Sequence, residues 1–184
     1  MSYPGFEDAL RRVVTGDDVD GQSVTIVDGG PAEIAAVAGA GGLLEIWTDI
    51  VSQPLDPKDH ADCGTGPVVL APPKGGVKIR WFVIEPVPGG IAKEQLDERV
   101  KELFRGFGAE EHIKDQRRHS AMHETPTLDI ICLLRGDASL ILENGETRLK
   151  PGQIVIQRNT NHAWVAHDGP ALFLSVLIDR PTAH

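Results

Sequence analysis

The sequence predicts an all-β sandwich or barrel, because frequent turn residues separate short β-type runs. Twenty glycines and thirteen prolines interrupt the 184 residues. Between them lie short runs rich in Val, Ile, Leu and Thr, a composition typical of β-sandwiches and barrels. The length suits one domain over residues 1–184. We expect its N-terminal part, 1–118, to supply strands, loops and a helix that pack on a core formed by 119–180.

Eight segments have the composition expected of strands. In chain order they are 23–27, 43–50, 77–86, 128–134, 139–142, 153–157, 162–166 and 171–178. The pair Asn144-Gly145 suits a tight hairpin between two of them. Residues 28–42 and 52–76 are rich in Gly, Pro, Ala and Asp and are predicted to be loops. Whether 52–76 covers a pocket as a lid is left open by the sequence.

Residues 91–107 interrupt the strand pattern. Apolar residues recur there at helical spacing among charged ones, namely Leu96, Val100, Leu103 and Phe104. Gly106 and Gly108 then provide stop signals. The segment therefore predicts a single amphipathic helix that lies outside the β core.

The charge balance argues against nucleic acid or an anionic membrane as a partner. The chain has 18 Lys and Arg against 27 Asp and Glu, a formal charge of -9. Phosphate binding relies on clustered cations, which this composition does not favour. No apolar run approaches the roughly 20 residues that span a bilayer, and no secretory signal is visible at the start. Cys63 and Cys132 form no CxxC pair, so we expect a reduced, cytoplasmic setting.

Residues 119–166 contain the most informative motifs. A first block places His123 six residues before Asp129, which is followed by Gly136. A second block begins at Gly152 and ends at His162. These two blocks resemble the cupin family, whose members are jelly-roll β-barrels that often hold a metal ion inside. The resemblance covers about a third of the chain and implies a cupin barrel with an N-terminal strand extension.

The chain departs from the cupin pattern at four positions, one of which is Asp129 in place of the usual Glu. The first His of the usual His-x-His pair is Ala121, and the Asn that commonly closes the second block is Ala166. A Gly of the second block is Asn159, which tolerates the left-handed conformation almost as well as Gly does. The turn can therefore survive, but part of the family's usual ligand set is missing.

Two interpretations of the remaining polar residues stay open. Alternation along a strand places Asp129 and Ile131 on the same face of their strand. His162 and Trp164 likewise share one face of a second strand. If both faces line the barrel, His123, Asp129 and His162 form a 2-His-1-carboxylate set suited to Fe, Mn, Ni or Zn. His119, four residues before His123, is a candidate replacement ligand. The alternative is a metal-free, hydrogen-bonded cluster inside the core.

Three further residues are candidates for substrate binding. Trp164 could form a stacking wall for a planar ligand or simply fill the core. Arg80 alternates with Trp81 in a predicted strand and could present its guanidinium to a substrate carboxylate. Arg158 is the other cation near the motifs, and a solvated surface role is the alternative for both arginines.

The residues support three hypotheses about function. A metal-dependent decarboxylase, isomerase or oxygenase would act on a small carboxylated or aromatic molecule. A metal-free enzyme would use Asp129 or His162 as general acid or base. A non-catalytic cupin would bind a small ligand without converting it. Because an exposed edge strand needs a covering partner, we expect a homodimer in each case.

Overall fold

The computed structural model describes residues 3–180 and contains eleven strands, one α-helix and one short 3-10 helix. The strands are β1 (Arg12–Asp17), β2 (Ser23–Gly29), β3 (Ile34–Val37), β4 (Gly41–Ile50), β5 (Gly76–Ile84), β6 (Thr127–Arg135), β7 (Ala138–Leu142), β8 (Gly145–Leu149), β9 (Ile154–Arg158), β10 (His162–Ala166) and β11 (Ala171–Asp179). The helix is α1 (Lys93–Gly106), followed by η1 (Glu110–His112). None of the described helices is long and apolar enough to cross a membrane.

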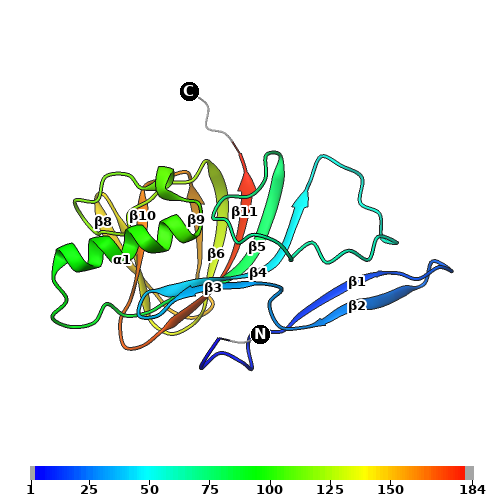
Figure 1. The fold of residues 1–184 in the computed structure, drawn as a ribbon, viewed down its shortest axis with the longest axis horizontal. Coiled ribbons are helices and arrows are strands. Elements are labelled where there is room, and N and C mark those ends of the chain that lie inside the picture. Colours follow the sequence, from blue (N-terminus) through cyan, green and yellow to red (C-terminus); the bar gives the residue numbers. More distant parts are fainter. Residues whose placement is uncertain (1–2, 181–184) are drawn as a thin grey trace.

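Two antiparallel sheets enclose the core, and a separate hairpin extends from them (Figure 1). The larger sheet has the order β3-β4-β5-β11-β6-β9, and the smaller has the order β10-β7-β8. Phe82 and Phe173 of the larger sheet pack with Leu140 and Trp164 of the smaller one. This arrangement confirms the predicted all-β, jelly-roll class, although the sheets do not close into a continuous hydrogen-bonded barrel.

Alternation along the strands decides which side chains face the core. In β6 the buried residues are Thr127, Asp129, Ile131 and Leu133, whereas Ile130 is exposed. The opposite face of the larger sheet is covered by the N-terminal segment, where Tyr3, Phe6 and Leu10 pack on Trp81 and Leu172. Residues 3–10 thus cover apolar side chains that the strand pattern turns away from the core.

The helix α1 lies within the predicted segment 91–107 and packs on the core with its apolar side. Val100 and Phe104 are buried, as is Phe107 just beyond the last turn. Because its charged residues remain exposed, the helix covers the core with one face only.

Three strands differ from the sequence-based expectation. Residues 28–42 were predicted to be a loop but contain β3, which pairs with the start of β4. The segments that form β1 and β8 were not predicted to be strands. Both are largely exposed on at least one face, and β8 consists mainly of polar residues, so apolar alternation gives little signal. No helix or strand forms between residues 52 and 75, as predicted.

The hairpin of β1 and β2 is tied to the segment 52–76 by a partly buried ion pair. The Arg12 guanidinium contacts the Asp62 carboxylate through both Nη atoms and also donates to the carbonyl oxygens of Gly30 and Ile46. Each of the three guanidinium nitrogens of Arg12 therefore has a hydrogen-bond partner. The loop is held beside the hairpin and continues from there toward the core.

We expect Gly41→Ala to destabilise the fold through a backbone clash. Gly41 has φ +129°, and a Cβ there would lie 2.0 Å from the Val83 carbonyl oxygen. Gly145 has φ +130°, but a Cβ there would meet nothing within 4 Å, so Gly145→Ala isolates the conformational cost. Urea unfolding should show a loss of about 1–3 kcal/mol for Gly145→Ala and about 1–3 kcal/mol more for Gly41→Ala. Equal unfolding midpoints for the two variants would contradict the proposed clash.

Candidate active site

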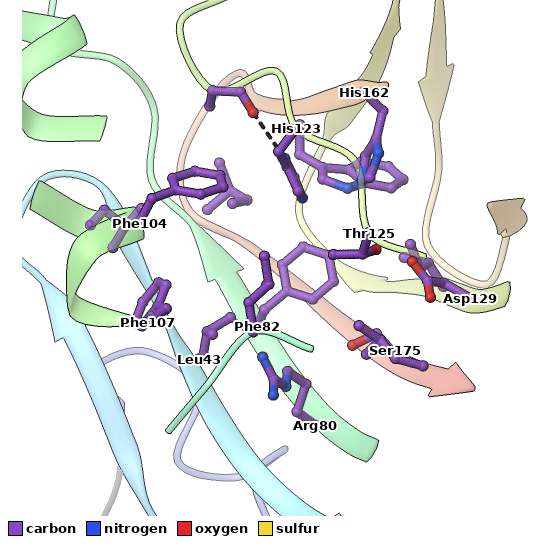
Figure 2. Close-up of a pocket in the computed structure, with 17 residues that line it drawn as sticks. Leu43, Arg80, Phe82, Phe104, Phe107, His123, Thr125, Asp129, His162 and Ser175 are labelled. Atoms are coloured by element: carbon purple, nitrogen blue, oxygen red, sulfur yellow. Dashed lines mark hydrogen bonds between the residues drawn. The ribbon is translucent and has the colours of Figure 1, made fainter. Parts of the chain in front are cut away.

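A mainly apolar cavity of about 120 Å³ lies between the two sheets and α1. Its aromatic wall is formed by Phe82, Phe104, Phe107 and Trp164. Its polar lining comprises Arg80, His123, Thr125, Asp129, His162 and Ser175. Figure 2 shows the imidazoles at one end of the cavity and Arg80 at the other, with Phe82 between them.

Asp129 is the acidic group of this cavity. Its side chain is only 3% exposed, and its Oδ1 atom is buried without a hydrogen-bond partner. Burial raises the pKa of Asp129 to about 6, although the Thr127 hydroxyl and the charge of Arg80 act in the opposite direction. The carboxyl group can therefore gain or lose a proton close to neutral pH.

His123 and His162 are held side by side by backbone pairing. Each backbone N–H donates to the carbonyl oxygen of the other residue at 2.9 Å. Their ring centroids are 4.3 Å apart. Nδ1 of His123 lies 2.9 Å from the Ala121 carbonyl oxygen, and Nδ1 of His162 lies 2.9 Å from that of Thr160. Because a carbonyl oxygen only accepts, Nδ1 carries the hydrogen in both rings and Nε2 keeps its lone pair.

Both imidazoles are neutral at physiological pH. Burial lowers the pKa of His123 to about 4 and that of His162 to about 3, where His123 adds to the effect. The two Nε2 atoms are thus a pair of hydrogen-bond acceptors at one end of the cavity. Such a pair can accept from a ligand hydroxyl, and it also has the orientation that metal-binding imidazoles adopt.

The predicted three-ligand metal set is not brought together. Among residues 3–180, no group of three His, Cys, Asp or Glu side chains lies close enough to hold a metal ion. His123 and His162 supply two nitrogen ligands, but Asp129 lines the cavity apart from them (Figure 2). The chain's own side chains therefore do not fit a 2-His-1-carboxylate centre.

Arg80 belongs to a cluster of buried charges on neighbouring strands. Its side chain is 1% exposed, and Nη2 lies 3.0 Å from Glu45 Oε1 and 2.6 Å from the Val69 carbonyl oxygen. Lys78 Nζ lies 4.0 Å from the same carboxylate and donates to the same carbonyl. Burial lowers the pKa of Arg80 to about 10, so the guanidinium remains charged at neutral pH. Its Nε and Nη1 atoms are buried without partners.

Trp164 forms part of the cavity wall, as the stacking hypothesis requires. Its ring centroid lies 4.9 Å from that of Phe173 and 6.1 Å from that of Phe82. Phe82 and Phe173 are stacked at 4.5 Å. These three rings pack against one another, and Phe82 and Trp164 also line the cavity.

Two predicted site residues lie elsewhere. Arg158 is exposed on the edge strand β9 and does not line the cavity. His119 is half-buried outside the lining, and its Nδ1 accepts a hydrogen bond from the backbone of Ala121. The segment before β6 turns at residues 119–121, so His119 and His123 do not share a face as they would on a continued strand.

Several lining residues were not identified from the sequence. Thr125 and Ser175 contribute hydroxyl groups, and Phe104 contributes a ring from the apolar face of α1. Leu70 shows that the segment 52–76 supplies part of the wall, and its backbone N–H donates to Phe107 at 3.1 Å. Glu45 and Lys78 lie outside the lining, but Glu45 contacts both Lys78 and Arg80. Their role in a buried charge cluster could have been predicted, because each is a charged residue at an inward position of a predicted strand.

Comparison with known proteins agrees with this architecture. The phomopsin biosynthesis cluster proteins C' and D of Diaporthe leptostromiformis are each 30% identical to the chain over 158 residues, 84% of this chain and 69% of theirs. A cupin-domain-containing oxidoreductase, fogC of Aspergillus ruber, is 35% identical over 65 residues, 33% of this chain and 32% of its own. The chain belongs to the cupin family. No family model matches this cupin.

Solved structures with a similar fold include two proteins of distant sequence. The putative ethanolamine utilization protein Q of Salmonella typhimurium has a TM-score of 0.43 and 10% identity, over 92% of this chain and 95% of its own. A cupin-like protein of Thermotoga maritima has a TM-score of 0.34 and 16% identity, over 56% and 57% of the two chains.

Replacement of Asp129 by Asn should stabilise the cupin at neutral pH. The folded-state pKa of about 6 lies above the ordinary value of 3.8, so the ionised carboxylate destabilises the fold. We expect a gain of up to about 3 kcal/mol above pH 6. The gain should shrink as the pH falls from 6 to 4, because Asp129 becomes neutral in the folded state, and it should vanish below the unfolded-state pKa of 3.8. Urea unfolding at pH 7.5 and pH 4 measures it, and an equal effect at both pH values would contradict the assignment.

Restoration of the missing first histidine should create a metal site. Ala121 lines the cavity beside His123 and His162, so Ala121→His would add the third nitrogen ligand. We expect this variant to bind Co(II) at least about tenfold more tightly than the wild-type chain, with the visible absorption of a cobalt–imidazole complex. Ala92→His, at an exposed position outside the lining, is the control. Equally tight binding by the wild-type chain would show that a third ligand is already present.

Proposed function

We propose that this cupin is an enzyme that transfers a proton on a small carboxylated or aromatic molecule, with Asp129 as the proton-transferring group. The observation that carries this proposal is Asp129 itself, which lines the cavity and whose buried Oδ1 has no hydrogen-bond partner in the protein. A polar group buried without a partner is costly. Such groups with a shifted pKa are concentrated at functional sites.

The size and walls of the cavity favour a ligand built around one ring. An engineered apolar cavity of about 150 Å³ binds benzene, and the cavity here has a similar volume of about 120 Å³. Phe82 and Trp164 offer ring faces on which a planar molecule can stack.

The proposed reaction begins with ionised Asp129 as general base. It removes a proton from a carbon next to a carbonyl group, and the electron pair of the broken C–H bond passes to the carbonyl oxygen. Return of the proton to a different atom completes an isomerisation. A decarboxylation would instead begin with loss of carbon dioxide from a 3-oxo carboxylate, the electron pair of the broken C–C bond would pass to the carbonyl oxygen, and protonated Asp129 would then deliver its proton to the carbon. Because its pKa lies near neutral pH, Asp129 can serve in both directions.

The neutral imidazoles have a supporting role in this proposal. Their Nε2 atoms accept hydrogen bonds from a ligand hydroxyl and so orient the ring. With pKa values of about 4 and about 3, they are weaker bases than Asp129. A metal-dependent decarboxylase, isomerase or oxygenase would need a further ligand from the substrate or another molecule, because the protein supplies two.

The names of the relatives support a role in small-molecule metabolism. Two relatives are named for a phomopsin biosynthesis cluster, and a third is named an oxidoreductase. The alternative of a non-catalytic ligand-binding cupin is favoured by one observation, the replacement of the first motif histidine by Ala121. A homodimer and a cytoplasmic setting stay predictions.

Hydrogen exchange into a probe substrate tests the catalytic proposal. Phenylpyruvate carries a ring, a carboxylate and an acidic carbon, and uptake of deuterium at that carbon can be followed by NMR. We expect Asp129→Asn to lower the enzyme-dependent rate by roughly 100-fold or more. The wild-type rate should rise as the pH passes through about 6.

Asp137→Asn provides the matched control, because Asp137 forms an exposed ion pair with Arg148 outside the cavity. Its exchange rate should equal that of the wild-type enzyme. An unchanged rate in Asp129→Asn would exclude Asp129 as the base. Binding of phenylpyruvate without exchange would favour the non-catalytic cupin.

A further inference from the structure

The cluster around Arg80 combines two basic side chains with one carboxylate. Arg80 and Lys78 are the basic residues, and Glu45 is the single carboxylate that contacts them. All three side chains are at most 4% exposed, so water does little to screen the charge of the Arg80 guanidinium. Ionised Asp129, which borders the same cavity, or a bound anion can balance it.

Arg80 combines a fixed guanidinium with donors that have no partner in the protein, and the residue lines the cavity. Glu45 and the Val69 carbonyl oxygen engage Nη2 and thereby fix the guanidinium, while Nε and Nη1 lack partners. Arg80 lines the cavity, whereas Lys78 and Glu45 are not part of the lining. A carboxylate that accepts from the free nitrogens would form a charge-assisted hydrogen bond at low local dielectric.

The opposite end of the cavity requires a different ligand group. Figure 2 shows His123 and His162 separated from Arg80, with Phe82 between the two ends. The imidazoles are neutral and offer lone pairs at Nε2, so they recognise a hydrogen-bond donor rather than an anion. The middle of the cavity is aromatic and suits a ring.

We infer that the substrate is a cyclic hydroxy monocarboxylate, with its carboxylate on Arg80 and its hydroxyl on the His123–His162 pair. This inference rests on the proposed use of the cavity as the substrate site. The two unpartnered nitrogens of Arg80, Nε and Nη1, match the two oxygens of one carboxylate group. Phe82 and Trp164 then contact the ring, and Asp129 lies beside it.

Calorimetric titration with ring compounds tests both ends of this orientation separately. The probes are benzoate, 3- and 4-hydroxybenzoate, and the corresponding neutral amides. We expect each carboxylate to bind at least about tenfold more tightly than its amide. One hydroxybenzoate should bind several-fold more tightly than benzoate. Equal affinities for acids and amides would overturn the anion site, and no gain from either hydroxyl position would overturn the assignment of the imidazole end.

Paired variants assign each preference to its residue. Arg80→Met should abolish the preference for acid over amide, whereas Arg158→Met, which removes an exposed guanidinium outside the cavity, should keep it. His162→Phe should abolish the hydroxyl gain and leave the acid preference. If Arg80→Met fails to fold, the Nε–H resonance of Arg80 in the wild-type protein is followed instead. It should shift with benzoate and not with benzamide, and the absence of a shift would overturn the inference.

The same series separates this inference from the proposed function. Asp129→Asn should retain the acid preference, because it keeps Arg80 and removes a competing carboxylate, while it loses hydrogen exchange. If Asp129→Asn loses exchange but the wild-type protein binds acids and amides equally well, the monocarboxylate inference alone is refuted. An acid preference combined with normal exchange in Asp129→Asn would refute the catalytic role of Asp129 alone.

Discussion

The geometry of the cavity depends on the two backbone hydrogen bonds that join His123 to His162. They align the segment before β6 with β10 of the smaller sheet and so connect two parts of the chain that are far apart in sequence. Each ring is then held by a carbonyl oxygen two residues before it. The orientation of both imidazoles therefore follows from the local backbone, and no third side chain is needed to set it.

Two buried arginines show how a structural role differs from a functional one in this molecule. Arg12 is paired with Asp62 and with two carbonyl oxygens, and its partners fix the hairpin and the loop 52–76. Arg80 is equally buried but leaves Nε and Nη1 without partners. Burial of unsatisfied donors lowers stability unless a ligand completes them. The incomplete set beside a cavity therefore indicates binding, whereas the complete set at Arg12 accounts for packing alone.

Sequence patterns predicted which face of each strand is buried. They did not predict which buried side chains of the two sheets lie opposite each other. Alternation placed Asp129 and His162 inward, and the structure agrees. These residues belong to different sheets, and the offset between two sheets depends on registers that periodicity does not encode. Hence the separation of Asp129 from the imidazoles could not be predicted. The strands β1 and β8 were missed because polar, exposed strands lack the apolar alternation on which such predictions depend.

The loss of the first motif histidine and the charge cluster at Arg80 have a common physical consequence. A divalent metal supplies positive charge next to the imidazoles, where it polarises a substrate and offsets a carboxylate. In this cupin the fixed positive charge belongs to a guanidinium at the opposite end of the cavity, and it remains charged at neutral pH. An anionic substrate would therefore be drawn away from the imidazoles and toward Arg80. In the proposed function, that orientation places the ring beside Asp129, which transfers a proton to or from the substrate without a Lewis acid.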